Sequence, residues 1–526
     1  MNMIKNPILT GFNPDPSMIR VNDDYYIATS TFQWWPGVLI HHSKDLINWH
    51  IAARPLDRVS QLDLKGCDDS CGVWAPCLSY HDGIFYLIYT DVKTRGPIMD
   101  VHNYLVTSDS ITGPWSEPVY LNSTGFDPSI FHDDDGKHYI LNMLCDYRKK
   151  EPAFGRFAGI LLQEYNINEK KLIGKPVNIF RGTQLGYTEG PNMYKHNGYY
   201  YLICAEGGTG YNHAATVARA KTILGEYEIH PKNPILTSKD DPALSLQRAG
   251  HASIIETKNG HFYMAHLASR PITEKRRSVL GRETCLQKFH WGDDNWPYLE
   301  GMDNKPKVLV PSPCLPEHKW EQLSKRDDFD SAELRMEYNT LRIPLSEDLC
   351  TLKERKGYLR LYGAESLNSK YTQSLVARRQ QHFRYTAQTC LEFEPENHLQ
   401  SAGLIALYDT NAYICLSISY DDAFGKYLSV IERNKDGLTI SEPVAINEYT
   451  RCYLKICVDY EKLCFFYSKD GSDWTQTRDT YDASILSDEY NSGRFTGAYV
   501  GICVQDLGGT KKHADFDYFE YEAGDC

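Results

Sequence analysis

The sequence predicts an all-β protein in which a five-bladed β-propeller is followed by a β-sandwich domain. Three observations lead to this prediction: a long repeat that carries hairpin signals, a proline-punctuated stretch after the fifth repeat, and a further series of alternating strands beyond that stretch. A chain of 526 residues is also too long for one hydrophobic core, so at least two domains are expected.

Each repeat opens on a short phrase that leads through a turn into a Tyr-rich strand. The phrases begin at Asp15, Trp74, Asp127, Glu189 and His251, which are 59, 53, 62 and 62 positions apart. This spacing is typical of propeller blades rather than of shorter solenoid units. Turns such as Asp-Gly and Asn-Gly predict a β-hairpin in each repeat. Because the first strand of a blade lines the channel, the five opening residues are expected to form a ring around the axis.

The domain boundaries follow from where the repeat stops. The propeller is predicted to occupy residues 1–304, and residues 305–325 are predicted to be a linker because four prolines fall between Lys305 and Trp320. Residues 326–526 contain alternating strands without the repeated phrase, a pattern typical of a β-sandwich.

Charge and composition argue against several classes of partner. The net charge is -13 and the pI about 5.8, and no basic patch is long enough to hold a phosphate backbone, so nucleic acid is not an expected partner. The N-terminus lacks an apolar signal segment, and no run approaches the length of a membrane span, so no membrane partner is expected.

The cysteines predict a cytoplasmic location. Fifteen is an odd number for a disulfide framework. Many of them stand at apolar strand positions, where a reduced, buried thiol behaves as a small hydrophobic side chain. These positions are Cys77, Cys204, Cys415, Cys457 and Cys503.

Three of the five opening residues are carboxylic acids, although strand starts have no structural reason to collect charge on an axis. Two facing acids are the minimum equipment for cleaving a glycosidic bond, because one protonates the departing oxygen and the other activates water or attacks the sugar. A third acid would raise the pKa of the proton donor by repulsion. Aromatic residues can stack on sugar faces, although at least one of Trp34 and Trp35 is expected to be blade packing.

Four motifs in this order resemble those of glycoside hydrolase family 43, and within it the β-xylosidase branch. The motifs are Gly11-Phe-Asn-Pro-Asp15-Pro-Ser, Gly125-Phe-Asp127-Pro-Ser, Tyr187-Thr-Glu189-Gly-Pro and Gly281-Arg282-Glu-Thr. The resemblance covers essentially the whole chain and implies a five-bladed propeller followed by a β-sandwich. It also implies hydrolysis with inversion of configuration.

The resemblance assigns roles by position. It implies that Asp15 is the general base that deprotonates the attacking water, that Glu189 is the general acid, and that Asp127 is the third acid, which tunes Glu189 and helps to hold the sugar. Arg282 matches an arginine that hydrogen-bonds the hydroxyls of the terminal xylose. Inversion requires room for a water between base and acid, so we predict a separation of roughly 6.5–9.5 Å between the Asp15 and Glu189 carboxyl groups.

Aromatic residues complete the implied sugar site. Phe32 and Trp74 match hydrophobic walls of the pocket, and Phe495, in the second domain, matches an aromatic that closes it. A closed pocket admits only a chain end, which indicates an exo-acting enzyme. Cys145 stands where many relatives carry Trp, so the preference for the leaving-group sugar stays open.

His251 completes the ring of opening residues. In the resembling family this His can approach a divalent cation, often calcium, that is bound largely by waters in the channel. Calcium prefers oxygen ligands, so one imidazole is a poor anchor. We therefore expect that no cofactor is required, with Ca²⁺ in the propeller channel as the one metal that the resemblance implies.

The favoured function is an inverting, exo-acting β-1,4-xylosidase that releases xylose from the non-reducing ends of short xylo-oligosaccharides. α-L-Arabinofuranosidase activity, as a main or side reaction, is the nearest alternative, because the two sugars present similar hydroxyl patterns. A protein that binds carbohydrate without cleaving it is the second alternative, although it would not need a complete set of acids. A retaining fructosidase is disfavoured by the motif around Asp15. The resemblance also implies a homo-oligomer, either a dimer or a tetramer.

Overall fold

The structure is a computed structural model that describes residues 3–148, 156–490 and 494–524. These residues form forty β-strands and one short 3₁₀ helix, η1 (Ala483–Ile485). Within this described part, no helix combines the length and the apolar character needed to cross a membrane. The content of forty strands and a single short 3₁₀ helix confirms the prediction of an all-β fold.

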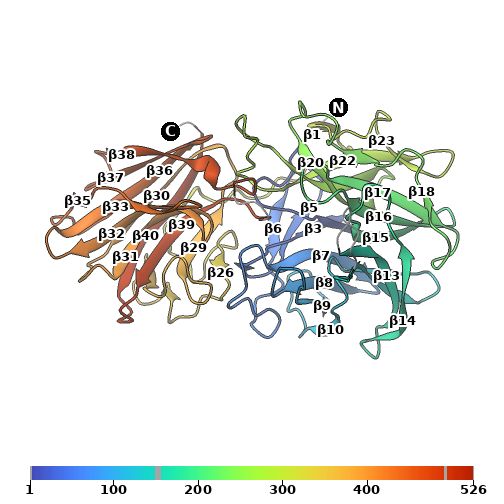
Figure 1. The fold of residues 1–526 in the computed structure, drawn as a ribbon, viewed down its shortest axis with the longest axis horizontal. Helices are drawn as coiled ribbons and strands as arrows, with labels where there is room; N and C mark the ends of the chain where they lie inside the picture. The colour runs from blue at the N-terminus through green and yellow to red at the C-terminus, as the bar shows by residue number, and fades with distance from the viewer. Residues whose placement is uncertain (1–2, 149–155, 491–493, 525–526) are drawn as a thin grey trace.

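The first three blades are antiparallel four-stranded sheets whose strands follow sequence order (Figure 1). Blade 1 contains β2 (Ser17–Val21), β3 (Asp24–Thr29), β5 (Leu39–Ser43) and β6 (His50–Ala53). Blade 2 contains β7 (Gly72–His81), β8 (Ile84–Val92), β9 (Val101–Ser108) and β10 (Val119–Asn122). Blade 3 contains β11 (Ser129–His132), β12 (His138–Cys145), β13 (Phe157–Asn166) and β14 (Lys171–Phe180).

The remaining two blades complete the propeller. Blade 4 contains β15 (Glu189–His196), β16 (Tyr199–Glu206), β17 (Ala214–Ala220) and β18 (Glu228–Ile229), and β19 (Leu236–Thr237) also pairs with β17. Blade 5 contains β20 (Gln247–Glu256), β21 (Phe262–Ser269), β22 (Glu283–Trp291) and β23 (Pro297–Leu299). The first strands of the blades contact one another in the cycle β2, β7, β11, β15, β20 and back to β2, so they form the inner ring of a closed propeller.

Hydrophobic side chains hold neighbouring blades together. A separate cluster of buried residues fills each of the interfaces between successive blades, including the interface between blades 5 and 1. The chain also closes on itself, because β1 (Met3–Lys5) pairs with β24 (Leu309–Pro311), which follows blade 5. These contacts make the inner ring a rigid frame for the strand starts that point toward the axis.

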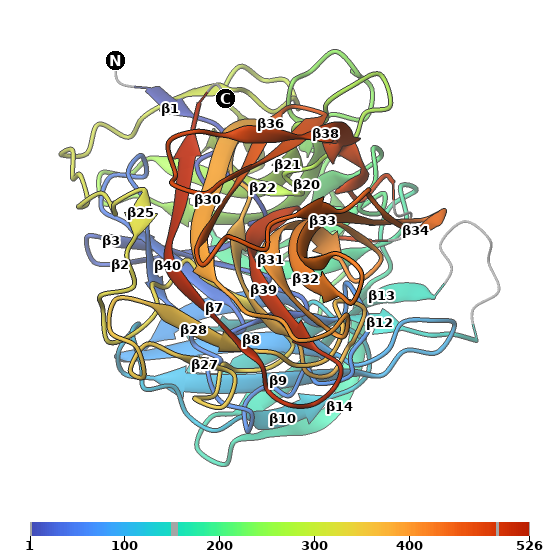
Figure 2. The ribbon, with the colours of Figure 1, turned by 90° about the vertical axis from the view of Figure 1, so that its left-hand side faces the viewer.

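The second domain consists of two antiparallel sheets packed over a large buried core, as expected for a β-sandwich (Figure 2). One sheet contains β27 (Cys350–Thr351), β28 (Leu359–Tyr362), β40 (His513–Ala523), β30 (Arg384–Glu392), β36 (Cys452–Asp459), β37 (Lys462–Ser468) and β38 (Thr475–Asp482), with β25 (Arg326–Asp327) beside β40. The other contains β29 (Ser374–Arg379), β39 (Tyr499–Asp506), β31 (Gln400–Asp409), β32 (Ala412–Asp421), β33 (Gly425–Asn434) and β34 (Gly437–Ile440), with β35 (Val444–Ala445) beside β33.

A two-stranded antiparallel sheet joins the two domains. β4 (Trp34–Trp35), from the loop after β3, pairs with β26 (Thr340–Leu341) of the second domain. Trp34 is fully buried, and its ring stacks on Tyr499 with the centroids 3.6 Å apart. Trp35 belongs instead to the buried cluster between blades 1 and 2. The expectation that at least one of the two residues is blade packing is therefore confirmed by Trp35, whereas Trp34 packs between the domains.

The cysteines follow the sequence expectation with one exception. Cys77, Cys204, Cys415 and Cys503 are buried free thiols. Cys457 is only half-buried and is disulfide-bonded, so the prediction of a reduced, buried thiol was wrong there. The side chains of β36 alternate between buried and half-buried, and Cys457 falls on the more exposed face of that strand.

Candidate active site

A pocket of ≈ 260 Å³ opens at the face of the propeller where the inner strands begin. The starts of all five inner strands contribute to it, so the ring expected from the repeat is present. Every site residue named from the sequence lines this pocket: Asp15, Phe32, Trp74, Asp127, Glu189, His251, Arg282 and Phe495. The structure therefore brings the whole predicted set together, including the residue from the second domain.

In all five blades the backbone takes a positive φ at the opening residue or directly after it. Asp15, Asp127 and His251 have φ values of 55°, 54° and 49°, in the left-handed region that residues with a side chain rarely adopt. In the other two blades the residue after the opening residue takes this conformation, at Ala75 (φ 30°) and at Gly190 (φ 57°), where glycine allows it without strain. The strained residues with side chains persist only where their surroundings hold them, and such residues concentrate at functional sites.

Both carboxylate oxygens of Asp15 accept hydrogen bonds. Nη1 of Arg282 donates a hydrogen bond of 2.8 Å to Oδ1, and the Ser30 hydroxyl donates one of 2.6 Å to Oδ2. Ser30 in turn accepts a hydrogen bond of 2.8 Å from the backbone N–H of Ala75 in the next blade. The buried carboxylate thus has a fixed orientation and a positive charge beside it, as a base that must align a water requires.

Glu189 and Asp127 are the other two buried acids of the pocket. Burial raises the pKa of Glu189 well above its usual range, and the negative charges of Asp127 and Asp15 raise it further, against a smaller opposing effect of Arg282. Burial, followed by the charge of Asp15, also raises the pKa of Asp127 to about 8. The backbone N–H of Gly190 donates a hydrogen bond of 3.0 Å to Oδ2 of Asp127, which fixes that side chain next to Glu189. A carboxyl group that keeps its proton near neutral pH can act as an acid.

Arg282 connects the acids to the second domain. Besides its contact with Asp15, its Nη2 donates a hydrogen bond of 3.0 Å to the backbone oxygen of Phe495. Its buried Nε has no hydrogen-bond partner among the described residues. A donor of this kind can be satisfied by a hydroxyl group of a bound sugar.

Aromatic rings follow one another along the pocket wall. The Trp74 ring lies 5.9 Å from Phe32, 5.3 Å from Phe126 and 6.1 Å from Phe495, measured between ring centroids. The guanidinium carbon of Arg95 lies 4.6 Å from the centroid of the Phe495 ring. The apolar faces of a pyranose ring can pack against a wall of this kind.

Half of the lining residues were not predicted from the sequence. They are Arg95, Met99, Phe126, Arg156, Phe157, Tyr187, Gly208 and Thr209. Phe126 directly precedes Asp127, and Tyr187 lies two residues before Glu189, so their places in the recognised motifs could have identified them. Arg95 and Met99 lie in the loop after β8, outside the repeated phrase, and carry no comparable signal.

The position of Cys145 bears on the leaving-group sugar. Cys145 is half-buried at the end of β12 and pairs in register with Phe157 on β13. Phe157 lines the pocket, and its ring packs against Phe126 with centroids 5.9 Å apart. An aromatic ring therefore stands in the pocket wall on the strand beside the small Cys145 side chain.

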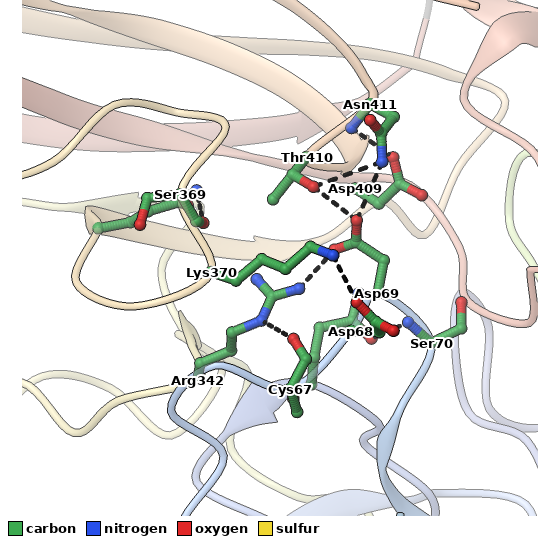
Figure 3. Close-up of polar contacts among 12 residues, drawn as sticks. Cys67, Asp68, Asp69, Ser70, Arg342, Ser369, Lys370, Asp409, Thr410 and Asn411 are labelled. Carbon is green, nitrogen blue, oxygen red and sulfur yellow. Dashed lines mark hydrogen bonds and ion pairs between the residues drawn. The ribbon is translucent and has the colours of Figure 1, made fainter. Parts of the chain in front are cut away.

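A buried polar network fixes the second domain against blade 2 (Figure 3). Asp69, in the loop before β7, is fully buried. Its Oδ1 accepts a hydrogen bond of 2.5 Å from Arg342, and its Oδ2 accepts bonds of 2.5 Å from Thr410 and 3.2 Å from Asn411. Arg342 also donates to the backbone oxygen of Cys67, so one loop of the propeller is held by three residues of the second domain.

This network leads directly to the pocket. Nη1 of Arg494 donates to the backbone oxygen of Asp69 at 2.9 Å, and the backbone N–H of Phe495 donates to the Ser70 hydroxyl at 3.1 Å. The indole N–H of Trp74 donates to the backbone oxygen of Ser70 at 3.0 Å. Ser70 therefore positions one ring from each domain at the pocket mouth.

The surroundings of His251 fit the expected calcium ion poorly. Its Nδ1 lies 3.9 Å from Oδ1 of Asp15, whose oxygens already accept hydrogen bonds from Arg282 and Ser30. Burial lowers the pKa of His251, and Arg282 lowers it further against the opposite effect of Asp15. Calcium takes roughly six to eight oxygen ligands, whereas this position offers one imidazole beside a guanidinium. No step of the reaction is therefore assigned to a metal.

Two family models match the chain: residues 4–297 match "Glycosyl hydrolases family 43", and residues 326–522 match "Beta xylosidase C-terminal Concanavalin A-like domain". The chain is 48% identical to "Beta-xylosidase" of Bacillus subtilis (strain 168), over 99% of each chain. It is 47% identical to "Xylosidase/arabinosidase 43B" of Humicola insolens, over 99% of this chain and 98% of the relative. The crystal structure of xylan beta-1,4-xylosidase from Bacillus Halodurans C-125 superposes with a TM-score of 0.97 at 51% identity, covering 99% of this chain and all of that one (100%).

Proposed function

This chain belongs to glycoside hydrolase family 43, and we propose that it is an inverting, exo-acting β-1,4-xylosidase that releases xylose from the non-reducing ends of short xylo-oligosaccharides. The observation that carries the proposal is the pocket at the starts of the inner strands. Three buried acids, one arginine and a wall of aromatic rings converge there, and the ring of Phe495 reaches it from the second domain.

In the proposed reaction, Asp15 takes a proton from a water molecule while that water attacks the anomeric carbon of the terminal sugar. Glu189 gives its proton to the glycosidic oxygen as the bond to the leaving sugar breaks. The reaction leaves Asp15 protonated and Glu189 ionised, and proton exchange with water restores both. Because water attacks the face opposite the leaving group, the product has inverted configuration.

The remaining polar residues support these two. Asp127 shares the buried region with Glu189, and ionisation of both would place two negative charges side by side, which favours a protonated donor. Arg282 balances the charge of Asp15 and offers a donor to the sugar hydroxyls. Neither residue needs to exchange a proton with the substrate.

Exo action is supported by the way in which the second domain covers the pocket. The ring of Phe495 reaches the wall formed by Trp74, and the contacts of Ser70 with both residues hold it there. A chain passing through the site would have to displace this ring. A single non-reducing end can enter without doing so.

α-L-Arabinofuranosidase activity is the second candidate, and the name of the Humicola insolens relative favours it as a side reaction. We would compare kcat/KM on nitrophenyl β-D-xylopyranoside and nitrophenyl α-L-arabinofuranoside, with Asp15→Asn, which lacks the proposed base, as a control for contaminating enzymes. A higher value on the xyloside supports the proposal. A higher value on the arabinoside would reverse the two candidates, and no hydrolysis of either would favour a carbohydrate-binding role.

A further inference from the structure

Three histidines meet on the face of the propeller opposite the pocket. His81 ends β7, His132 ends β11, and His138 begins β12, so the group joins blades 2 and 3. One imidazole nitrogen from each lies within 4.8 Å of the others. The same two inner strands have Trp74 and Asp127 at or beside their pocket ends. At about 3.3 Å per residue, the cluster is on the order of 20 Å from the pocket.

The three rings pack closely against one another. Nδ1 of His132 and Nδ1 of His138 are 2.8 Å apart, and the ring of His81 stacks on that of His132 with centroids 4.6 Å apart and planes 5° from parallel. The Ser79 hydroxyl lies 3.1 Å from Nε2 of His132 and leaves its Nδ1 directed at His138. Two nitrogens at this distance share one proton at most, because one must donate and the other accept.

The acids that face the cluster, Asp82 and Asp135, lie on turns at its outer side. A metal ion binds to the lone pair of a neutral imidazole nitrogen, so each of the three rings can offer one ligand atom.

A fourth histidine stands at the same repeat position, the end of a blade's first strand, but has no other histidines of the cluster beside it. His196 ends β15 in blade 4, as His81 and His132 end their strands in blades 2 and 3. Its ring stacks on Trp291, with centroids 4.1 Å apart and planes 12° from parallel. Histidine at this position therefore has a packing role in blade 4. Blades 2 and 3 differ because His138 lies beside the pair formed by His81 and His132.

We propose that His81, His132 and His138 form a structural site for a divalent transition-metal ion, zinc being the expected ion, that clamps blade 2 to blade 3. Three imidazole nitrogens and one open position match the tetrahedral preference of zinc, whereas calcium and magnesium prefer oxygen ligands. The exposed carboxylate of Asp82, 3.3 Å from Nε2 of His81, or a water molecule can occupy the fourth position. The site is separate from the pocket and supplies no step of the hydrolysis.

The test uses the full-length protein, stripped with a chelator, dialysed and titrated with ZnCl₂ by calorimetry. His81→Gln and His138→Gln are compared with the wild type, and His196→Gln serves as the matched control at the same repeat position. We expect the wild type and the His196→Gln control to bind one equivalent of zinc. The two cluster variants should bind no zinc, or bind it at least roughly 100-fold more weakly. Zinc should also raise the Tm of the wild type and of the control, but not of the cluster variants.

Anomalous diffraction at the zinc edge then locates the ion between the three rings. The rate on the nitrophenyl xyloside should be the same with and without zinc, because the cluster is far from the pocket. The proposal is wrong if the wild type takes up no zinc, or if His138→Gln and the wild type bind equal amounts with equal affinity. The second result would show that zinc binds to other histidines of the chain.

Discussion

The pocket and the domain interface both bury carboxylic acids, but they surround them differently. At the interface, Asp69 accepts hydrogen bonds from Arg342, Thr410 and Asn411, so its negative charge faces a guanidinium and two further donors. In the pocket, Asp127 accepts one backbone hydrogen bond, and burial together with neighbouring acids raises the pKa values of Asp127 and Glu189. A compensated acid holds two domains together, whereas an uncompensated acid is suited to carry a proton.

The same comparison explains how the two domains share one site. The propeller supplies the acids on strained strand starts that the repeat places around an axis. The sandwich supplies Phe495, and the network around Asp69 and Ser70 sets where that ring lies. The repeat of the propeller therefore places the catalytic acids, and the contacts between the domains determine how the substrate reaches them.

The largest effect is expected for the two residues that exchange protons. Asp15→Ala or Glu189→Ala should lower kcat on xylobiose by several orders of magnitude, because each group supplies roughly 10²–10⁴-fold of acid–base assistance. Glu189→Ala should lose much less on a nitrophenyl xyloside, whose phenolate leaves without protonation. Steady-state kinetics on the two substrates checks this. Equal losses on both would remove Glu189 from the role of acid.

The stabilities of Asn variants at Asp69 and Asp127 test whether the two buried acids differ as described. Asp69→Asn should lower the free energy of unfolding by about 3–5 kcal/mol, because it leaves the charge of Arg342 buried without its partner. Asp127→Asn should instead raise the Tm at neutral pH while lowering activity. Thermal unfolding of both variants across pH measures this. Destabilisation by Asp127→Asn at pH 7 would show that its charge is compensated after all.

Burial raises the pKa of Asp127 to about 8 in the folded protein, well above the value near 4 that is usual for an Asp carboxyl group. A group whose folded pKa is raised contributes stability that is fully present below about pH 4 and is lost as the pH rises toward 8. Asparagine does not titrate, so the Tm difference between Asp127→Asn and the wild type should grow in favour of the variant between about pH 4 and pH 8. A constant difference across that window would contradict the raised pKa.

A smaller effect is expected at the pocket mouth. Phe495→Ala should raise KM for xylobiose by roughly 2- to 10-fold, the range that corresponds to an aromatic contact of about 0.5–1.5 kcal/mol. Phe424→Ala, an exposed ring elsewhere in the second domain, is the matched control and should leave KM unchanged. If KM stays constant and only the Tm falls in Phe495→Ala, the ring serves domain packing rather than the sugar.

The smallest effect is expected for metal removal. Exhaustive chelation, and calcium added back afterwards, should leave the xyloside rate unchanged, because His251 stands beside Arg282 with few free oxygen ligands. A rate that falls on chelation and returns with calcium would assign the metal a role in the pocket.

Much of the site could be predicted because the repeat encodes it. Five strand starts in phase are forced onto one axis, so Asp15, Asp127 and Glu189 converge whatever the details of packing. The interface carries no such periodicity, since Asp69 meets Arg342 and Thr410 across 273 and 341 residues of chain. Those contacts depend on how the two domains dock, which no local pattern records.

The cluster of His81, His132 and His138 could be predicted only in part from the sequence. His81 and His132 occupy equivalent repeat positions, which the sequence shows, but His196 occupies the same position and stacks on Trp291 instead. Whether the rings meet depends on the packing of one blade against the next. The cysteines are a further example, because the exposure of Cys457 is set by its place on β36 and not by its apolar neighbours in sequence.

The most direct test of the proposed acid–base pair is proton NMR of xylobiose hydrolysis, followed from the first seconds in buffered D₂O. An inverting enzyme in which Asp15 activates water and Glu189 protonates the leaving oxygen must release α-xylose first, before mutarotation mixes the anomers. We expect α-xylose as the initial product. If β-xylose comes first, the mechanism is retaining, and the roles proposed for Asp15 and Glu189 are wrong.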